Sequence, residues 1–242
     1  MKYIYSIIGT LFFMSIAIGQ EAIEVQLKEY NAGKADIITG ITGPIKIGTI
    51  NDDGIIKIPL DNSYKDKLIA SIDSDNAGSS DWKTSLPTVQ RSYGNCATGE
   101  VNIEGGEQIM IALGTVGMFS IANMEERKVY GKIMFASNQE FAEAFLAFGK
   151  FKVKKGYQLD WLYFEKEATV EGSCSLESYT SNMEEKYNYV TEYSLDFKPG
   201  WNLVKYEILE VFTDSDGNQY TSHDRSTVID DIPKDVQICY IK

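Results

Sequence analysis

The chain has 242 residues, of which 43% are hydrophobic and 12% aromatic, so it can bury a sizeable core and is not expected to be disordered. Its formal net charge is −12, from 35 acidic and 23 basic residues. Nucleic acids and anionic membrane surfaces are bound through patches of Lys and Arg, so this balance argues against both kinds of partner.

The first 19 residues have the features of a secretory signal peptide. Lys2 gives a short basic start, and an almost wholly apolar run covers residues 4–18. Ala17 and Gly19 are small residues two positions apart, which favours cleavage between Gly19 and Gln20. The apolar run is short for a membrane span, and no Cys follows the cleavage site. The sequence therefore predicts a secreted or periplasmic mature chain with no membrane span and no lipid anchor.

Residues 20–75 have the pattern of an N-terminal β-sandwich-like region. Alternating or apolar stretches predict short strands at residues 23–27, 35–42, 44–50, 55–60 and 67–72. The run Asn51-Asp52-Asp53-Gly54 is typical of a tight hairpin turn. Short strands separated by turns at this spacing are characteristic of sandwich folds.

Residues 96–242 are predicted to form a larger β-rich region. Strands are expected at residues 99–103, at 108–115 and within 151–170. Residues 186–220 then alternate in the manner of two long strands, joined at Lys198-Pro199-Gly200. A second reversal is expected at residues 214–217, because Asp and Gly suit tight turns.

One short amphipathic helix is predicted near residues 138–148. Ser137 and Glu140 have the spacing of a capping box, with Ser137 as the N-cap. Phe141, Phe145 and Phe148 then recur on one helical face, which is expected to pack against a sheet. The fold class predicted from the whole sequence is mainly β and β-sandwich-like, with this helix added.

Residues 73–95 form the longest segment without clear periodicity, and they are rich in Ser, Asp, Asn and Gly. We expect a long loop or linker here, with a domain boundary at residues 76–95. A single continuous domain over residues 20–242 is an equal alternative.

The three cysteines are too few for a disulfide scaffold. Export permits a disulfide, and Cys96 and Cys174 both lie in turn-like polar contexts, so this pair is the candidate. Cys239 lies in an apolar stretch and is expected to be a buried thiol. The sequence has no Cys/His cluster, so structural zinc is not expected.

The acidic stretch after residue 72 partly matches a calcium-binding loop. Asp73, Asp75 and Asp81 provide carboxylates at three positions of the EF-hand pattern. Ala77 stands where the pattern has Asp or Asn, and Thr84 stands where it has the bidentate Glu. Calcium is therefore the one cofactor considered, and a solvated acidic loop is the competing interpretation.

No catalytic constellation stands out. His223 is the single histidine, flanked by Ser and Asp, but no nucleophile elbow accompanies it, so a hydrolase triad is not expected. Glu165 and Glu167 come closest to the acid-plus-aromatic cluster of a glycoside hydrolase. Trp82, in the polar segment, is the candidate for an exposed ring that stacks on a ligand.

Residues 156–174 (GYQLDWLYFEKEATVEGSC) and 195–204 (LDFKPGWNLV) resemble a loose group of uncharacterised exported or lipid-anchored bacterial β-rich proteins. In that group an aromatic-rich strand leads to a turn with small residues and a Cys, and a later strand carries K-x-G-W-N-x-V. The resemblance covers the C-terminal third and implies a secreted β domain, with no activity to carry over. The chain differs from the lipid-anchored members in lacking a Cys after its signal peptide.

These observations favour an exported, non-enzymatic binding or interaction protein of the bacterial cell envelope, with an unknown extracellular or periplasmic ligand. The alternative is a carbohydrate-binding module or a glycoside hydrolase-like enzyme whose carboxylates the sequence does not single out. An open cleft with two facing carboxylates and an aromatic floor would favour the enzyme.

Overall fold

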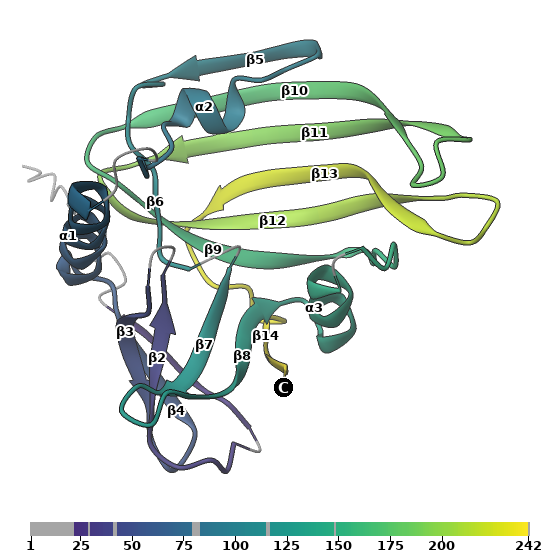
Figure 1. Cartoon of the computed structure of the whole chain (residues 1–242). Coiled ribbons are helices and arrows are strands. Elements are labelled where there is room, and N and C mark those ends of the chain that lie inside the picture. Colours follow the sequence, from purple (N-terminus) through teal and green to yellow (C-terminus); the bar gives the residue numbers. More distant parts are fainter. Residues whose placement is uncertain are drawn as a thin grey trace, which may run out of the picture.

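The structure, a computed structural model, describes residues 22–28, 30–40, 43–78, 83–114, 117–147 and 149–241 (Figure 1). The strands in the first half of the chain are β1 (Ala22–Gln26), β2 (Ala35–Thr39), β3 (Ile45–Ile50), β4 (Ile55–Pro59), β5 (Thr98–Glu104), β6 (Ile111–Ala112) and β7 (Met118–Asn123). Those in the second half are β8 (Lys128–Ala136), β9 (Gly156–Phe164), β10 (Ala168–Tyr179), β11 (Lys186–Phe197), β12 (Gly200–Thr213), β13 (Gln219–Ile229) and β14 (Gln237–Ile241). The helices are α1 (Ser63–Gly78), α2 (Val89–Tyr93) and α3 (Gln139–Leu146). The predicted mainly β class is confirmed.

The strands belong to one large open sheet. Its order is β1-β4-β3-β2-β7-β8-β9-β12-β13-β11-β10-β5, while β14 pairs with β8 and β6 pairs with β9. Hydrogen bonds between β2 and β7 join the strands of residues 20–75 to the later strands. In Figure 1 the long strands β9 to β13 run side by side, and the shorter strands β2, β3, β7 and β8 lie at a steep angle to them.

The two reversals predicted at residues 51–54 and 214–217 are present. The turn Lys198-Pro199-Gly200 also joins two long strands, but these strands do not pair as a hairpin. Instead β13 lies between them, antiparallel to β12 and parallel to β11. Asn202 holds the turn, because its Oδ1 accepts from the Lys198 amide at 2.8 Å and its Nδ2 donates to the Lys198 carbonyl at 2.8 Å.

Helix α1 corrects two predictions. Residues 67–72 were expected to be a strand and residues 73–95 a loop, but helix α1 extends to Gly78 and helix α2 begins at Val89. Tyr64, Leu68 and Ile72 are the buried residues of α1, and their spacing of four is that of one helical face. A window that begins at residue 67 omits Tyr64 and so misses this period.

Helix α3 confirms the predicted amphipathic helix but begins one residue later than the capping box indicated. The N-cap is Asn138, whose Oδ1 accepts a hydrogen bond from the Phe141 amide at 2.8 Å. Ser137 has a different partner, since its Oγ accepts from the amide of Tyr157 on β9 at 3.2 Å. Phe148 lies outside the described residues.

The main hydrophobic core lies between the N-terminal strands, α1 and one face of β9. Phe119, Phe135 and Trp161 form its aromatic centre, with the Phe135 and Trp161 ring centroids 5.0 Å apart. Each of these rings is at most 2% exposed, so each contributes on the order of 2 kcal/mol through burial. Within the described ranges, no helix has both the length and the hydropathy that crossing a bilayer requires.

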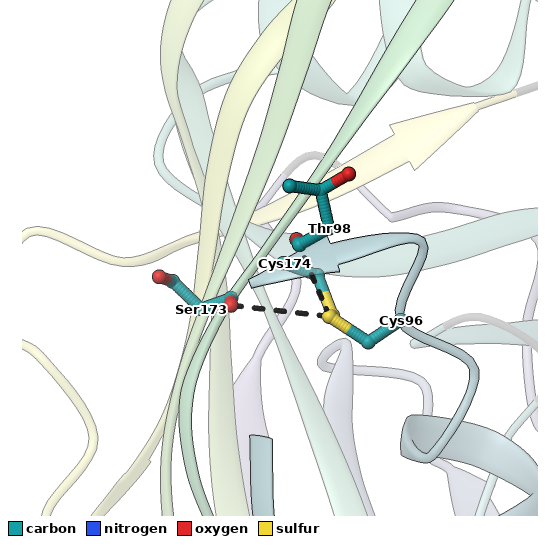
Figure 2. Close-up of a disulfide and its surroundings, with 4 residues drawn as sticks. All are labelled: Cys96, Thr98, Ser173 and Cys174. Atoms are coloured by element: carbon teal, nitrogen blue, oxygen red, sulfur yellow. Dashed lines mark hydrogen bonds between the residues drawn. A yellow bond between two sulfur atoms is a disulfide. The ribbon is translucent and has the colours of Figure 1, made fainter. Parts of the chain in front are cut away.

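Cys96 and Cys174 form a disulfide, the pair that the sequence favoured (Figure 2). It connects the segment before β5 to β10, across 78 residues of sequence. The Sγ of Cys96 lies 3.5 Å from the carbonyl oxygen of Thr98 and 3.9 Å from that of Ser173. Because β5 is the last strand of the sheet, the bond anchors an edge strand.

Cys239 is a buried free thiol, as expected, and burial raises its pKa to about 11.

Replacing both bonded cysteines (Cys96→Ser with Cys174→Ser) should lower the free energy of unfolding by about 2–4 kcal/mol. The cross-link closes a long loop, so its loss restores conformational entropy to the unfolded chain. Urea unfolding with and without dithiothreitol measures the difference, and the reductant should leave the double variant unchanged. Equal urea midpoints for the oxidised wild type and the double variant would contradict this expectation.

Candidate functional site

Strand β9 is largely buried on both of its faces, and the two faces differ in chemistry. Tyr157, Leu159 and Trp161 belong to the main core. Successive side chains of a strand point to opposite sides, so Gln158 and Asp160 point away from that core. Both line a cavity of about 340 Å³.

The cavity lies on the face of the sheet that α2 and α3 cover. Tyr93 of α2 contacts Tyr193 of β11, with ring centroids 5.3 Å apart, and Phe145 of α3 contacts Tyr206 of β12 at 6.0 Å. In Figure 1, α2 lies beside β10 and β11, and α3 lies near the start of β9. The lining residues are Tyr93, Met110, Ala112, Phe145, Gln158, Asp160, Leu162, Val204, Tyr206 and Ser226. A mostly apolar wall with a few polar groups is typical of small-molecule sites.

Gln158 is the most unusual polar residue of this cavity. Its side chain is 2% exposed, and its Nε2 donates to Asp160 Oδ2 at 3.3 Å. Its Oε1 has no hydrogen-bond partner in the described part of the chain. Leaving a buried acceptor unpaired costs about 1–3 kcal/mol, which a bound donor would recover.

Asp160 is the carboxylate that the cavity presents. Burial raises its pKa to about 6, and a hydrogen bond from the Gly117 amide partly opposes this shift. Gly117 has φ +64°, and a Cβ there would lie 2.8 Å from the Leu159 carbonyl oxygen and 3.0 Å from Asp160 Oδ1. Glycine is therefore required for this close approach. With a pKa near 6, Asp160 can exchange a proton close to neutral pH.

A second carboxylate lies behind Tyr206. Asp224 of β13 is fully buried, and its Oδ2 accepts from the hydroxyl of Tyr189 at 2.5 Å and from that of Tyr206 at 2.8 Å. Burial, together with the interaction with Asp224, raises the pKa of both tyrosines, so they remain protonated donors. Asp224 Oδ1 has no partner among the described residues. This network joins β11, β12 and β13.

The calcium candidates are not assembled as a loop. Asp73 and Asp75 lie in helix α1, whereas an EF-hand site needs a loop conformation. Asp73 lines a different cavity, of about 450 Å³, with Ile69 and Tyr163. Asp81 and Trp82 lie outside the described residues. Within the ranges that the structure describes, no group of three or more His, Cys, Asp or Glu residues could hold a metal ion.

The other residues weighed from the sequence lie apart from the cavity. His223 Nε2 is 3.0 Å from Glu192 Oε1, and the alternation of β13 places His223 on the face opposite Asp224. Glu165 and Glu167 form surface ion pairs with lysines, at 3.3 Å and 3.6 Å respectively.

Sequence reasoning missed Gln158 and Asp160. The available signal was polar residues alternating with the apolar Leu159 and Trp161, but the same alternation describes a strand with one face in water. In the folded chain, Tyr93 of α2 and Phe145 of α3 pack over that face, where Gln158 is buried and Asp160 is partly exposed.

Comparison of this chain with protein-family models, with curated proteins and with solved structures finds no match. The assignment of the site therefore depends on its geometry.

Asp160→Asn should change how stability depends on pH. The pKa of Asp160 is raised from 3.8 to about 6 in the folded chain, so the folded state binds the proton more tightly than the unfolded state. In the wild type this group loses stabilising free energy as pH rises from about 4 through 6. Relative to the wild type, the variant should therefore gain roughly 1–3 kcal/mol between pH 4 and pH 7.

Urea unfolding at several pH values measures this gain, and Asp230→Asn, at an exposed position, is the control. A difference between wild type and Asp160→Asn that does not vary with pH would show that Asp160 is not desolvated.

Tyr189→Phe should lower the free energy of unfolding by about 1.5–3 kcal/mol, because it removes a hydrogen bond to a buried carboxylate. Tyr187→Phe is the matched control on the same strand, since the Tyr187 ring stacks on Phe212 and its hydroxyl makes no hydrogen bond within the described residues. The control should change stability by less than about 0.5 kcal/mol. Equal losses for the two variants, measured by urea unfolding, would argue against the network.

Proposed function

We propose that the chain is an exported binding protein of the bacterial cell envelope and that its ligand site is the cavity between α2 and α3. The observation that carries the proposal is the buried, unpaired Oε1 of Gln158 in a lined cavity of about 340 Å³. Most buried polar side-chain atoms in folded proteins have a hydrogen-bond partner, so an unpaired acceptor in a cavity calls for an explanation, and a bound ligand would be one. A ligand of moderate size would fill this space and supply the missing donor.

Export is supported by two independent features. The first 19 residues have a signal-peptide pattern, and the chain contains a disulfide between Cys96 and Cys174. Disulfides persist in oxidising compartments such as the periplasm and the extracellular space.

The lining supports binding rather than glycoside hydrolysis. Two carboxylates flank the scissile bond in most glycoside hydrolases, but Asp160 is the single acid in the lining of this cavity. Asp224 lies behind Tyr206 and is engaged by two tyrosine hydroxyls. One observation favours the enzymatic alternative: the pKa of Asp160, raised to about 6, is that of a potential general acid.

Filling the cavity tests the proposed function. Ser226→Phe places a ring in the cavity from β13, whereas Ser194→Phe places the same ring at an exposed position on neighbouring β11. The full chain and both variants would be screened by thermal shift against chito-oligosaccharides, muropeptides, amino acids and organic amines. A ligand of the cavity should raise the melting temperature of the wild type and of Ser194→Phe but not that of Ser226→Phe.

Circular dichroism would be used to check that Ser226→Phe is folded. If every shift seen with the wild type persists in folded Ser226→Phe, the cavity is not the binding site and the proposal fails. Cleavage of an added glycan, lost in Asp160→Asn, would support the enzymatic alternative instead.

A further inference from the structure

We propose that the cavity binds an organic primary ammonium ion, held by Gln158 and Asp160, with its apolar part against the surrounding rings. This inference rests on the proposed binding function and specifies its ligand class.

The polar groups of the cavity are mainly acceptors. Gln158 Oε1 is buried without a partner in the described part of the chain, and its Nε2 is already used by Asp160. A carboxylate can accept about four hydrogen bonds, and Asp160 receives one from Gln158 and one from the Gly117 amide. A primary ammonium group has three N–H donors, so one group can supply both residues.

The lining also has no positive charge to balance Asp160, since it contains no Lys, Arg or His. The basic residues of β12 and β13, the strands that line the cavity beside β9, lie on the opposite face. Lys205 of β12 and Arg225 of β13 both pair there with Glu207, at 2.9 Å and 3.1 Å. A carboxylate in a desolvated site is costly without a cation, so a cationic ligand would supply a counter-ion that the described protein does not. The formal net charge of −12 would also attract cations.

The rest of the wall suits the carbon skeleton of such a ligand. Tyr93, Phe145 and Tyr206 bring aromatic rings from α2, α3 and β12. Aromatic faces attract cations by up to about 2 kcal/mol in a desolvated site, and they also pack against ligand rings. Met110 and Leu162 add apolar surface for an alkyl segment. An arylalkylamine combines both features.

Isothermal titration calorimetry of the full chain at pH 7.5 tests the ammonium assignment. The three probes share a phenylethyl group and differ in their polar group: phenethylamine, 2-phenylethanol and 3-phenylpropanoate. Phenethylamine should bind at least tenfold more tightly than the alcohol, and the carboxylate should not bind. Asp160→Asn should weaken phenethylamine binding at least tenfold and bring it close to that of the alcohol. Asp230→Asn, which removes an exposed carboxylate, should leave the affinities for phenethylamine and for 2-phenylethanol unchanged.

The outcomes separate this inference from the proposed function. Equal affinity for amine and alcohol, no binding of phenethylamine, or unchanged binding in Asp160→Asn would overturn the ammonium assignment. In those cases the proposed function still stands if another compound binds the wild type and no longer binds folded Ser226→Phe. Phenethylamine binding that persists in folded Ser226→Phe would place the amine outside the cavity and overturn the ammonium assignment, and the proposed function would fail as well if every other bound compound also persists.

Discussion

Strand β9 has to satisfy two environments at once, and the rest of the structure depends on this constraint. Leu159 and Trp161 complete the main core, while Gln158 and Asp160 enter the cavity under α2 and α3. The register with β12 decides which residues take which side. A shift by one residue would place a carboxylate in the main core and the indole of Trp161 in the cavity. The packing that stabilises the fold therefore also positions the candidate site.

The buried Asp224 plays a related part in the order of the strands. Tyr189 on β11 and Tyr206 on β12 donate to one of its oxygens from either side, so β13 is held between these two strands. If β11 paired directly with β12, β13 could not lie between them, and Asp224 could not receive hydrogen bonds from both Tyr189 and Tyr206. Because Tyr206 also lines the cavity, the network connects the strand order to the shape of the site.

The sequence predicts parts of this fold that arise from local periodicity and turn chemistry: many of the strands, the reversals, helix α3 and the pairing of Cys96 with Cys174. It predicted neither β7 nor β8. Helix α1 was missed because its buried stripe is one residue wide, with Tyr64, Leu68 and Ile72 four apart. The insertion of β13 depends on long-range hydrogen bonds, which turn residues do not determine. Asp160 was missed because 35 acidic residues look alike until packing desolvates one of them.

The proposed ammonium site requires that the carboxyl group of Asp160 be desolvated and accept a cation. Its carboxyl ¹³C chemical shift, assigned with Asp160→Asn and followed by NMR against pH, tests this most directly. We expect a midpoint near pH 6 in the free protein and a lower midpoint with saturating phenethylamine, because a bound cation favours the charged carboxylate. A midpoint near the ordinary value of 3.8, or one that phenethylamine leaves unchanged, would contradict it.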